Sequence, residues 1–370
     1  MNDHNYTQIS GGQLVLLLIT LVGATAILYA PSMSIRIAGR DAWLSILVPA
    51  TLYGLLVVWV TTRLALGFAG LSFREYTEAL TGKWMARLIN FLYCLYAVTL
   101  LIVIVREFGN VLSTAFMPET PMLVFHLSLL VLCIYATWGG IEVICRVNQF
   151  HLPLLFFTIA FLFLFLAKDV KLDRLLPFME NGFVPVLKGA IVPCAFRGEV
   201  FVLLWLVSHL KEPWDGPRLG TLAVAILGIL LALDTFTILT VLGKELSSRE
   251  TLATLSVVRY INIGDFLNRT EGLALIIWIC SVVTKASAFF YIAAESAKAA
   301  LGLPRSNGYL LGGLGLIILV AALYIFKNDL QVVWFLEKLF PPLSLLFQLI
   351  IPGALLGLAW VKKKGAGSRG

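Results

Sequence analysis

Long apolar windows alternate with short polar connections along the whole chain. A helix needs about 20 apolar residues to cross roughly 30 Å of hydrocarbon. Ten windows come close to that length or exceed it, and in chain order they are 7–35, 42–62, 88–105, 120–141, 147–167, 189–210, 219–243, 272–294, 306–326 and 339–361. The pattern predicts an all-α membrane protein with about ten transmembrane helices.

Three connections between these windows are too long to be simple turns. They cover residues 63–87, 168–188 and 245–271. The last one carries apolar residues at helical spacing between positions 252 and 261, beside Arg249 and Arg259. This pattern predicts an interfacial amphipathic helix, with a re-entrant segment as the alternative.

The sixth window has a polar centre, where Pro193, Arg197, Gly198 and Glu199 interrupt an apolar run. Proline removes a backbone donor and clashes with the preceding turn, and glycine weakens a helix interior. Each charge costs roughly 2.5–3.5 kcal/mol at the centre of a bilayer, so charges there usually pair or serve a function. We expect a broken helix that forms half of a small-molecule site.

Dividing the ten windows into five plus five pairs the sixth window with the first, which contains Gly23 near its middle. Interrupted segments at corresponding positions are typical of an inverted-repeat transporter, whose site lies between them. We therefore predict one transmembrane domain over 1–370, with a first repeat at about 10–168 and a second at about 185–362. A single glycine also serves close helix packing, so Gly23 alone leaves both interpretations open.

Lys285 stands in the middle of the eighth window, beside Thr284 and Ser287. In inverted-repeat symporters, backbone carbonyls hold a coupling cation near the site. The Lys285 ammonium could replace that cation or exchange its proton. The alternative is an ion pair with Glu199, Asp234 or Glu107 that only fixes helix positions, and the sequence leaves both open.

Two tyrosines of the third window, Tyr93 and Tyr96, lie one helical turn apart. A tyrosine offers an apolar wall and a hydroxyl donor, which suits an amino-acid pocket. Tyr96, the deeper of the two, is the preferred candidate. Arg106 and Glu107 follow at the end of the window, where they could be interfacial or close a gate.

Composition supports the membrane assignment and excludes other classes. Hydrophobic residues make up 59% of the chain and charged residues 13%, against about 25% charged in soluble domains. The net charge of +7 reflects basic connections and the tail KKK at 362–364, which favour termini on the cytoplasmic side. A nucleic-acid surface would need a continuous basic face, which the pattern lacks.

Little in the sequence indicates a catalytic site or a metal site. The five cysteines and four histidines are scattered, without the spacing of a metal site or of a disulfide framework. The sequence shows neither a nucleotide-binding loop nor a nucleophile–base constellation. We expect that the protein is not an enzyme and holds no metal or cofactor.

Several short segments resemble the spore germination permease family, the B subunits of nutrient germinant receptors. These segments are ISGGQ at 9–13, GAT at 23–25, YAP at 29–31, AGRDAW at 38–43, GKW at 82–84 and GE at 198–199, together with Trp278 and Lys285. That family is part of the amino acid–polyamine–cation superfamily. The resemblance implies the LeuT-type fold, with five plus five helices in an inverted repeat and broken first and sixth helices.

The family resemblance also implies a function and a set of site residues. Proteins like this bind a nutrient, often an amino acid, and act with an A subunit and a C-subunit lipoprotein in the inner spore membrane. By the family pattern the pocket would be lined by Gly23, Ala24, Thr25, Tyr96, Cys194, Ala195, Phe196, Thr284 and Ser287. The residues expected to serve ion coupling or gating are Lys285, Glu199, Arg197 and Arg106.

Arg197 departs from the family pattern, which more usually has an apolar residue there. The extra cation would favour an anionic ligand group or neutralise Glu199. The leading hypothesis for the whole chain is a ligand-sensing subunit that shifts between conformations. The alternatives are an amino acid:cation symporter and an ion or water channel subunit.

Overall fold

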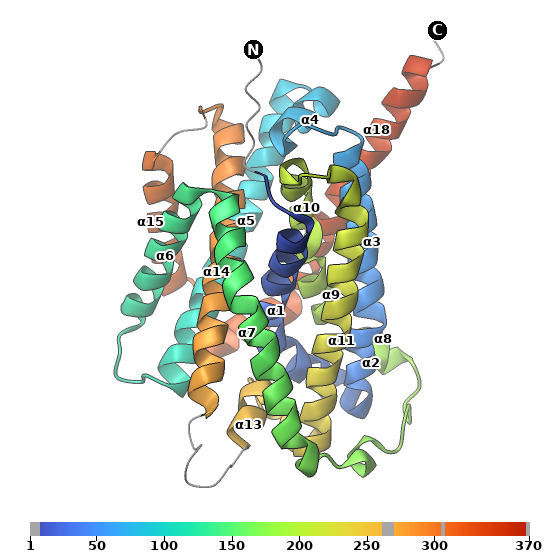
Figure 1. The fold of residues 1–370 in the computed structure, drawn as a ribbon, viewed down its shortest axis with the longest axis vertical. Helices are drawn as coiled ribbons and strands as arrows, with labels where there is room; N and C mark the ends of the chain where they lie inside the picture. The colour runs from blue at the N-terminus through green and yellow to red at the C-terminus, as the bar shows by residue number, and fades with distance from the viewer. Residues whose placement is uncertain (1–7, 261–269, 305–307, 368–370) are drawn as a thin grey trace.

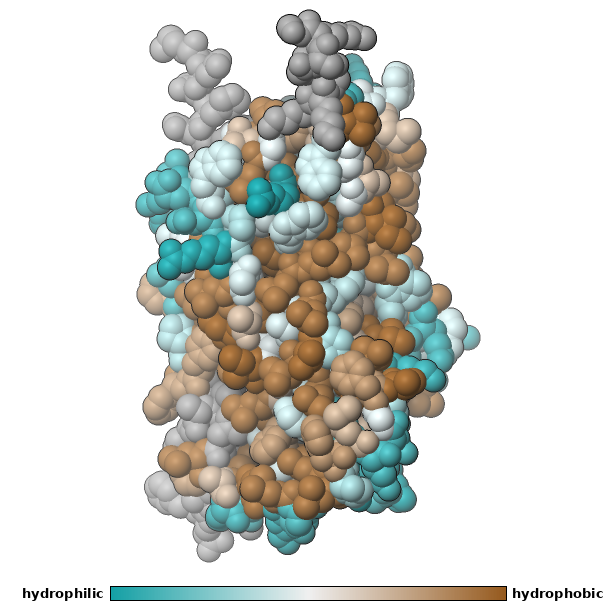
Figure 2. Space-filling view, turned by 90° about the vertical axis from the view of Figure 1, so that its right-hand side faces the viewer, coloured by the Kyte–Doolittle hydropathy of each residue, from teal (hydrophilic) through white to brown (hydrophobic). Residues whose placement is uncertain are grey.

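The computed structural model describes residues 8–260, 270–304 and 308–367, and these residues form a helical bundle (Figure 1). Seven helical stretches in this part of the chain are long and apolar enough to cross a membrane, or eight if one bent pair counts as a single span. Figure 2 shows a wide apolar band between polar ends, as a bilayer requires. The chain is a multi-pass membrane protein.

The first half of the bundle is built from seven α-helices. They are α1 (Gly11–Ala38), α2 (Ala42–Leu47), α3 (Pro49–Leu66), α4 (Phe73–Thr81), α5 (Lys83–Ala115), α6 (Met122–Gly139) and α7 (Ile141–Leu166), with the short 3₁₀ segment η1 (Gly39–Asp41) between α1 and α2. Ser10 and Gln13 form a capping box at the start of α1, which satisfies two otherwise free backbone donors. Gly82, at φ 80°, separates α4 from α5.

The second half contains shorter pieces as well as long helices. They are η2 (Ala167–Asp169), η3 (Leu172–Leu175), α8 (Val184–Gly189), α9 (Ile191–Arg197), η4 (Gly198–Val202), α10 (Leu203–Leu206), η5 (Val207–His209), η6 (Pro213–Asp215), α11 (Gly216–Leu242), α12 (Lys244–Ser247), α13 (Ala253–Tyr260), α14 (Thr270–Leu301), α15 (Gly308–Tyr324), α16 (Asp329–Lys338), α17 (Phe340–Ser344), η7 (Leu345–Ile350) and α18 (Ile351–Gly367). Among these, η7 is a π-helical segment.

Helix α1 occupies the centre of the bundle (Figure 1). It contacts α11, α14, α7, α8, α2 and α9. Most of its residues are buried, including the polar Thr20, Thr25, Ser32 and Ser34. Because α1 is enclosed by other helices, any polar group that it carries at mid-height faces protein rather than lipid.

The sixth window is interrupted, as the sequence predicts. It folds as α9, then a 3₁₀ turn η4 that begins at Gly198, then α10. Pro193 lies in the first turn of α9, where its missing N–H has no helical acceptor to lose. Arg197 and Glu199 point to different sides of the segment, because residues two positions apart lie on nearly opposite faces of a helix: Glu199 lines the central cavity and Arg197 lies against Gly54.

The first window differs from the expectation of a broken helix, because α1 runs through Gly23 without interruption. A glycine lowers the helix propensity by only about 1 kcal/mol, and the packing around α1 compensates for that loss. The chain therefore offers no half-helix N-terminus at Gly23. The carbonyl of Ala24 instead accepts a hydrogen bond from Trp278 Nε1 of α14 at 2.8 Å.

The ten predicted windows also differ in detail from the observed helices. The first two fall within one helical stretch, Gly11–Leu66, and the fifth lies within α7. Helix α16, which the hydropathy pattern did not indicate, follows α15 at an angle of 107°. Polar residues at both of its ends made this helix hard to recognise in the hydropathy pattern, yet it buries Val332, Phe335 and Leu336.

The connection 245–271 contains a short helix, as the sequence predicts, and this helix is attached to the bundle. Its helix α13 packs against α1, α11 and α14. The hydroxyl of Thr254 lies 2.6 Å from the carbonyl of Ile27 and 3.0 Å from Asp234 Oδ2, and Ala253 N donates to Ser32 Oγ. These polar contacts hold α13 on the bundle, at the end opposite the two termini (Figure 1). Ile261 and residues to 269 lie outside the described part of the chain.

Gly189 of α8 provides a test of the packing around α1. A Cβ at this position would lie 2.8 Å from Ala38 Cβ and 3.0 Å from Ser45 Oγ. We expect Gly189→Ala to lower the free energy of unfolding by about 1–3 kcal/mol through overpacking. Equilibrium SDS unfolding in mixed micelles measures the change.

The matched control is Gly353→Ala in α18, where a Cβ meets nothing within 4 Å. This control should raise stability slightly, by about 0.5–1 kcal/mol, because alanine favours the helix. Equal effects of the two substitutions would contradict the close approach of α8 to α1.

Candidate functional site

A small cavity lies at the centre of the bundle, with a volume of about 10 Å³. Its polar lining, among the residues that the structure describes, consists of Thr25, Glu107, Glu199 and Lys285. The apolar lining is Leu100, Val103, Ile104, Phe196, Phe335, Leu336 and Phe340. Such a volume holds about one water molecule, so the cavity is closed to any larger solute in this conformation.

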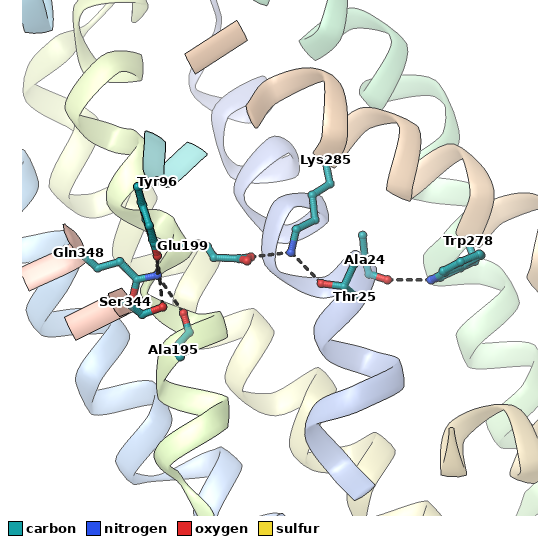
Figure 3. Close-up of polar contacts among 9 residues, drawn as sticks. All are labelled: Ala24, Thr25, Tyr96, Ala195, Glu199, Trp278, Lys285, Ser344 and Gln348. Carbon is teal, nitrogen blue, oxygen red and sulfur yellow. Dashed lines mark hydrogen bonds and ion pairs between the residues drawn. The ribbon is translucent and has the colours of Figure 1, made fainter. Parts of the chain in front are cut away.

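Lys285 links three elements across this cavity (Figure 3). Its Nζ donates at 2.7 Å to Thr25 Oγ1 of α1 and at 2.7 Å to Glu199 Oε2 of η4. The Lys285 side chain is fully buried and that of Glu199 is 2% exposed. The rings of Phe196 and Phe289 lie 5.6 and 5.8 Å from the ammonium, close enough for cation–π attraction. The alternative of an ion pair with Glu199 is therefore observed.

Glu107 of α5 is the second carboxylate of the cavity. It is 1% exposed, and its Oε1 has no hydrogen-bond partner. Two carboxylates thus face one ammonium, so the polar lining lacks one positive charge when both carboxylates are ionised. A proton, a cation or the ammonium group of a ligand would supply that charge.

A second polar network joins α5, α9 and the π-helical segment (Figure 3). Gln348 Nε2 donates to Tyr96 Oη at 3.1 Å and to the Ala195 carbonyl at 3.0 Å. Tyr96 Oη also lies 3.1 Å from Ser344 Oγ. The Tyr96 ring stacks on Phe347 with centroids 4.4 Å apart. The hydroxyl of Tyr96 is therefore committed to protein partners and does not line the central cavity.

Two larger hollows lie on either side of the central cavity. One has a volume of about 470 Å³ and is lined by residues that include Arg74, Glu78, Asn90 and Lys298. The other has about 300 Å³ and is lined by residues that include Tyr29, Asn110, Arg249 and Asp329. Neither hollow has a residue in common with the cavity.

The layers of protein that separate the central cavity from the two hollows, which we call its closures, differ in thickness. Toward the first hollow, Phe73, Tyr93, Trp205 and Phe201 form a cluster of rings, mostly edge-to-face or tilted, with centroids 4.2–6.1 Å apart. Toward the second, the hollow begins one helical turn from the cavity, since Tyr29 follows Thr25 on α1 and Asn110 follows Glu107 on α5. The thinner closure is the one farther from the termini.

The predicted site residues fall into two groups. Thr25, Phe196, Glu199 and Lys285 meet at the cavity. The other predicted residues lie around the cavity and contact other parts of the protein. On α1, Gly23 faces Leu227 and the Ala24 carbonyl accepts from Trp278, while on α9 Cys194 Sγ donates to the Pro49 carbonyl. On α14, Thr284 Oγ1 donates to the Cys280 carbonyl, and the Ser287 carbonyl accepts from Thr137. Arg106 and Arg197 are buried but do not line the cavity.

Sequence reasoning named Glu107 only as a possible partner of Lys285 or as an interfacial or gate residue, and it missed Gln348 and Ser344. A buried carboxylate in the third window was visible, but its neighbour Arg106 suggested an interfacial pair. Gln348 is a lone polar residue in the last apolar window, which was the available signal. Its role depends on η7, because the π-helical turn brings Ser344 and Gln348 to Tyr96.

Comparison with known proteins explains this architecture. The sequence profile of the family described as "Spore germination protein" matches residues 8–330. The chain belongs to the spore germination protein family. It is 28% identical to spore germination protein KB of Bacillus subtilis (strain 168), over 98% of each chain. It is 26% identical to spore germination protein XB of Bacillus anthracis, over 93% of this chain and 96% of that one.

Solved transporters share the fold of this family member. Mhp1, a nucleobase-cation-symport-1 family transporter, aligns with a TM-score of 0.65 over 96% of this chain and 80% of its own, at 12% identity. MhsT in complex with L-phenylalanine aligns with a TM-score of 0.67 over 90% and 87%, at 15% identity. A Na⁺-coupled sialic acid symporter aligns with 0.63 over 96% and 80%, at 14% identity. The LeuT-type fold expected from the sequence is confirmed.

The Lys285–Glu199 pair gives a prediction for stability. Removing one partner leaves an uncompensated buried charge, so Lys285→Met alone should cost about 3–5 kcal/mol of unfolding free energy. The double variant Lys285→Met with Glu199→Gln should recover most of the loss, because neither charge remains. SDS unfolding in mixed micelles measures both.

The control pair is Lys298–Glu295 on α14, which is partly exposed at 15% and 33%. Lys298→Met should change stability by less than about 1 kcal/mol. Similar losses of unfolding free energy for Lys285→Met and Lys298→Met would show that the buried central pair contributes no more to stability than the partly exposed pair.

Proposed function

We propose that this spore germination protein binds a small zwitterion, an amino acid, between α1, α5, η4 and α14. We also propose that it signals binding by a change of conformation, as the B subunit of a germinant receptor. The observation that carries the proposal is that one cavity holds an unpartnered acceptor for an ammonium group, Glu107 Oε1, together with a donor for a carboxylate group, Lys285. The names of the relatives, which are spore germination proteins, support the biological setting.

The proposed binding mode uses the groups of the cavity as they lie. The ammonium group of the ligand pairs with Glu107, whose Oε1 lacks a partner. The carboxylate of the ligand accepts from Lys285 Nζ and Thr25 Oγ1, which lie 2.7 Å apart. The apolar lining, with Phe196, Phe335 and Phe340, favours an uncharged side chain on the ligand.

Binding by this mode requires a conformational change. A cavity of about 10 Å³ cannot hold an amino acid, so the ligand binds only to a more open state. A ligand with that preference shifts the population toward the open state. Moving the ratio from 1:99 to 99:1 takes about 5.5 kcal/mol of differential affinity. Such a shift is what a sensor needs, and the proposal assigns no catalytic step to these groups.

The competing function is an amino acid:cation symporter. It is favoured by the likeness in fold to symporters and by the place of Lys285, whose ammonium sits among α1, η4 and α14 where a coupling cation would be held. An ion or water channel subunit is a further alternative, and it predicts flux without coupling to a substrate.

We further propose that the protein acts in the inner spore membrane with an A subunit and a C-subunit lipoprotein, and that both termini are cytoplasmic. Both termini lie at one end of the bundle, next to α4 (Figure 1). Basic residues gather in the chain around this end, at Arg63, Arg74, Lys83 and Arg87. Short basic loops are retained on the cytoplasmic side of a membrane.

Glu107→Gln tests the binding mode. Because Glu107 Oε1 has no partner to lose, the substitution should leave folding intact and weaken amino-acid binding about tenfold or more, equivalent to about 1.4 kcal/mol. Thermal-shift screening of the common amino acids on purified protein identifies the ligand, and titration calorimetry compares the affinities.

Glu142→Gln is the control, since Glu142 pairs with Arg146 on α7, away from the cavity. Binding that is equally strong in Glu107→Gln would remove Glu107 from the site. A lack of stabilisation by every amino acid in the wild-type protein would reject the proposed ligand class.

Counterflow in liposomes separates the sensor from the symporter. With the amino acid found by thermal shift, the sensor should bind without exchanging labelled ligand across the membrane. Val103→Trp, which places an indole at a position that lines the cavity, serves as the variant blocked in binding. Robust counterflow by the wild type, lost in Val103→Trp, would make the protein a transporter.

A further inference from the structure

Arg197 is a deeply buried charge with no ion-pair partner in the part of the chain that the structure describes. Its side chain is 1% exposed, and Nε, Nη1 and Nη2 all lack a hydrogen-bond partner. No acidic side chain among the described residues pairs with it, and the nearby Glu199 is bound to Lys285. The sequence-based idea that Arg197 neutralises Glu199 is therefore not what the structure has.

The Arg197 guanidinium keeps its positive charge although it is buried. Arginine stays protonated in proteins and presents five N–H donors in a rigid plane. An isolated charge in an apolar interior is strongly unfavourable unless it is paired and hydrogen-bonded. The pairing group is missing from the described residues, so a small anion that binds at this position would supply it.

The space for Arg197 is provided by a glycine of the facing helix. A Cβ on Gly54 of α3 would overlap Arg197 Cγ and lie 3.2 Å from Cδ, and it would also lie 3.0 Å from Val224 Cγ1 of α11. The stem of Arg197 thus lies against α3, close to α11. Its neighbours Phe196 and Glu199 line the central cavity, whereas Arg197 does not.

We propose that Arg197 binds a small monovalent anion where α9 meets α3 and α11. The guanidinium recognises chloride or a small carboxylate through its N–H donors, because planar donors suit such anions. The anion balances the charge of the sixth segment, which otherwise carries Arg197 uncompensated next to the Glu199–Lys285 pair. This site is separate from the central cavity, and it does not depend on which ligand binds there.

The test follows the thermal unfolding of the purified full-length protein at constant ionic strength. Gluconate, a much larger anion, is replaced stepwise by chloride or by formate. The wild-type midpoint should rise and saturate with the small anion. Saturation at lower formate than chloride assigns the site to carboxylates, and the reverse order assigns it to halides.

Three variants test whether the dependence of the unfolding midpoint on the anion comes from Arg197. Arg197→Met, of similar length and without charge, should remove the dependence on the anion. Arg197→Lys should keep it with a half-saturation about tenfold higher, because a point charge replaces the planar donors. Arg63→Gln, at an exposed arginine of α3, is the control and should behave as the wild type does.

Two outcomes overturn the proposal. One is a wild-type midpoint that is the same in gluconate, chloride and formate. The other is an anion dependence that survives unchanged in Arg197→Met. If Arg197→Met fails to fold, Gly54→Ala replaces it, since its Cβ displaces the Arg197 stem and should raise the half-saturation concentration; an unchanged value there would also reject the site.

Discussion

The buried contact of Lys285 with Glu199 and Thr25 is the constraint on which the centre of this protein depends. The ammonium is removed from water and lies 2.7 Å from each of its two partners. A charge buried so deeply is tolerated only when its partners stay in place. The contact therefore fixes the relative positions of α1, η4 and α14, three elements far apart in sequence.

The same contact explains why the central cavity is closed. With Lys285 drawn to Glu199, the apolar side chains of α5, α16 and α17 close around it and leave about 10 Å³. Glu107 remains on the wall without a partner for Oε1. In the binding mode that we propose, the ammonium group of the ligand pairs with Glu107 and its carboxylate competes for Lys285. Binding and the rearrangement of three helices are then one event, which is the physical requirement for a sensor.

The two closures of the cavity have different constructions, and they resist opening differently. The closure nearer the termini is a cluster of aromatic rings around Trp205, reinforced by the hydrogen bond from Tyr76 Oη to the Leu204 carbonyl. The opposite closure is one helical turn thick and is covered by α13, a short helix held by a few polar contacts. Fewer buried contacts make α13 the easier element to displace.

The sequence by itself determined the membrane-spanning helices, because an apolar window of about 20 residues has few other stable structures. It also determined the interruption at Gly198 and the importance of Glu199 and Lys285, since charges within apolar windows are costly. Tertiary structure alone decided which acid pairs with Lys285, that Tyr96 binds Gln348 instead of lining the cavity, and that Arg197 faces α3. It also decided that α1 continues through Gly23, and it placed α16 and α13 on the bundle. Those outcomes depend on contacts between residues that are distant in the chain, and hydropathy, which is a local property, does not encode them.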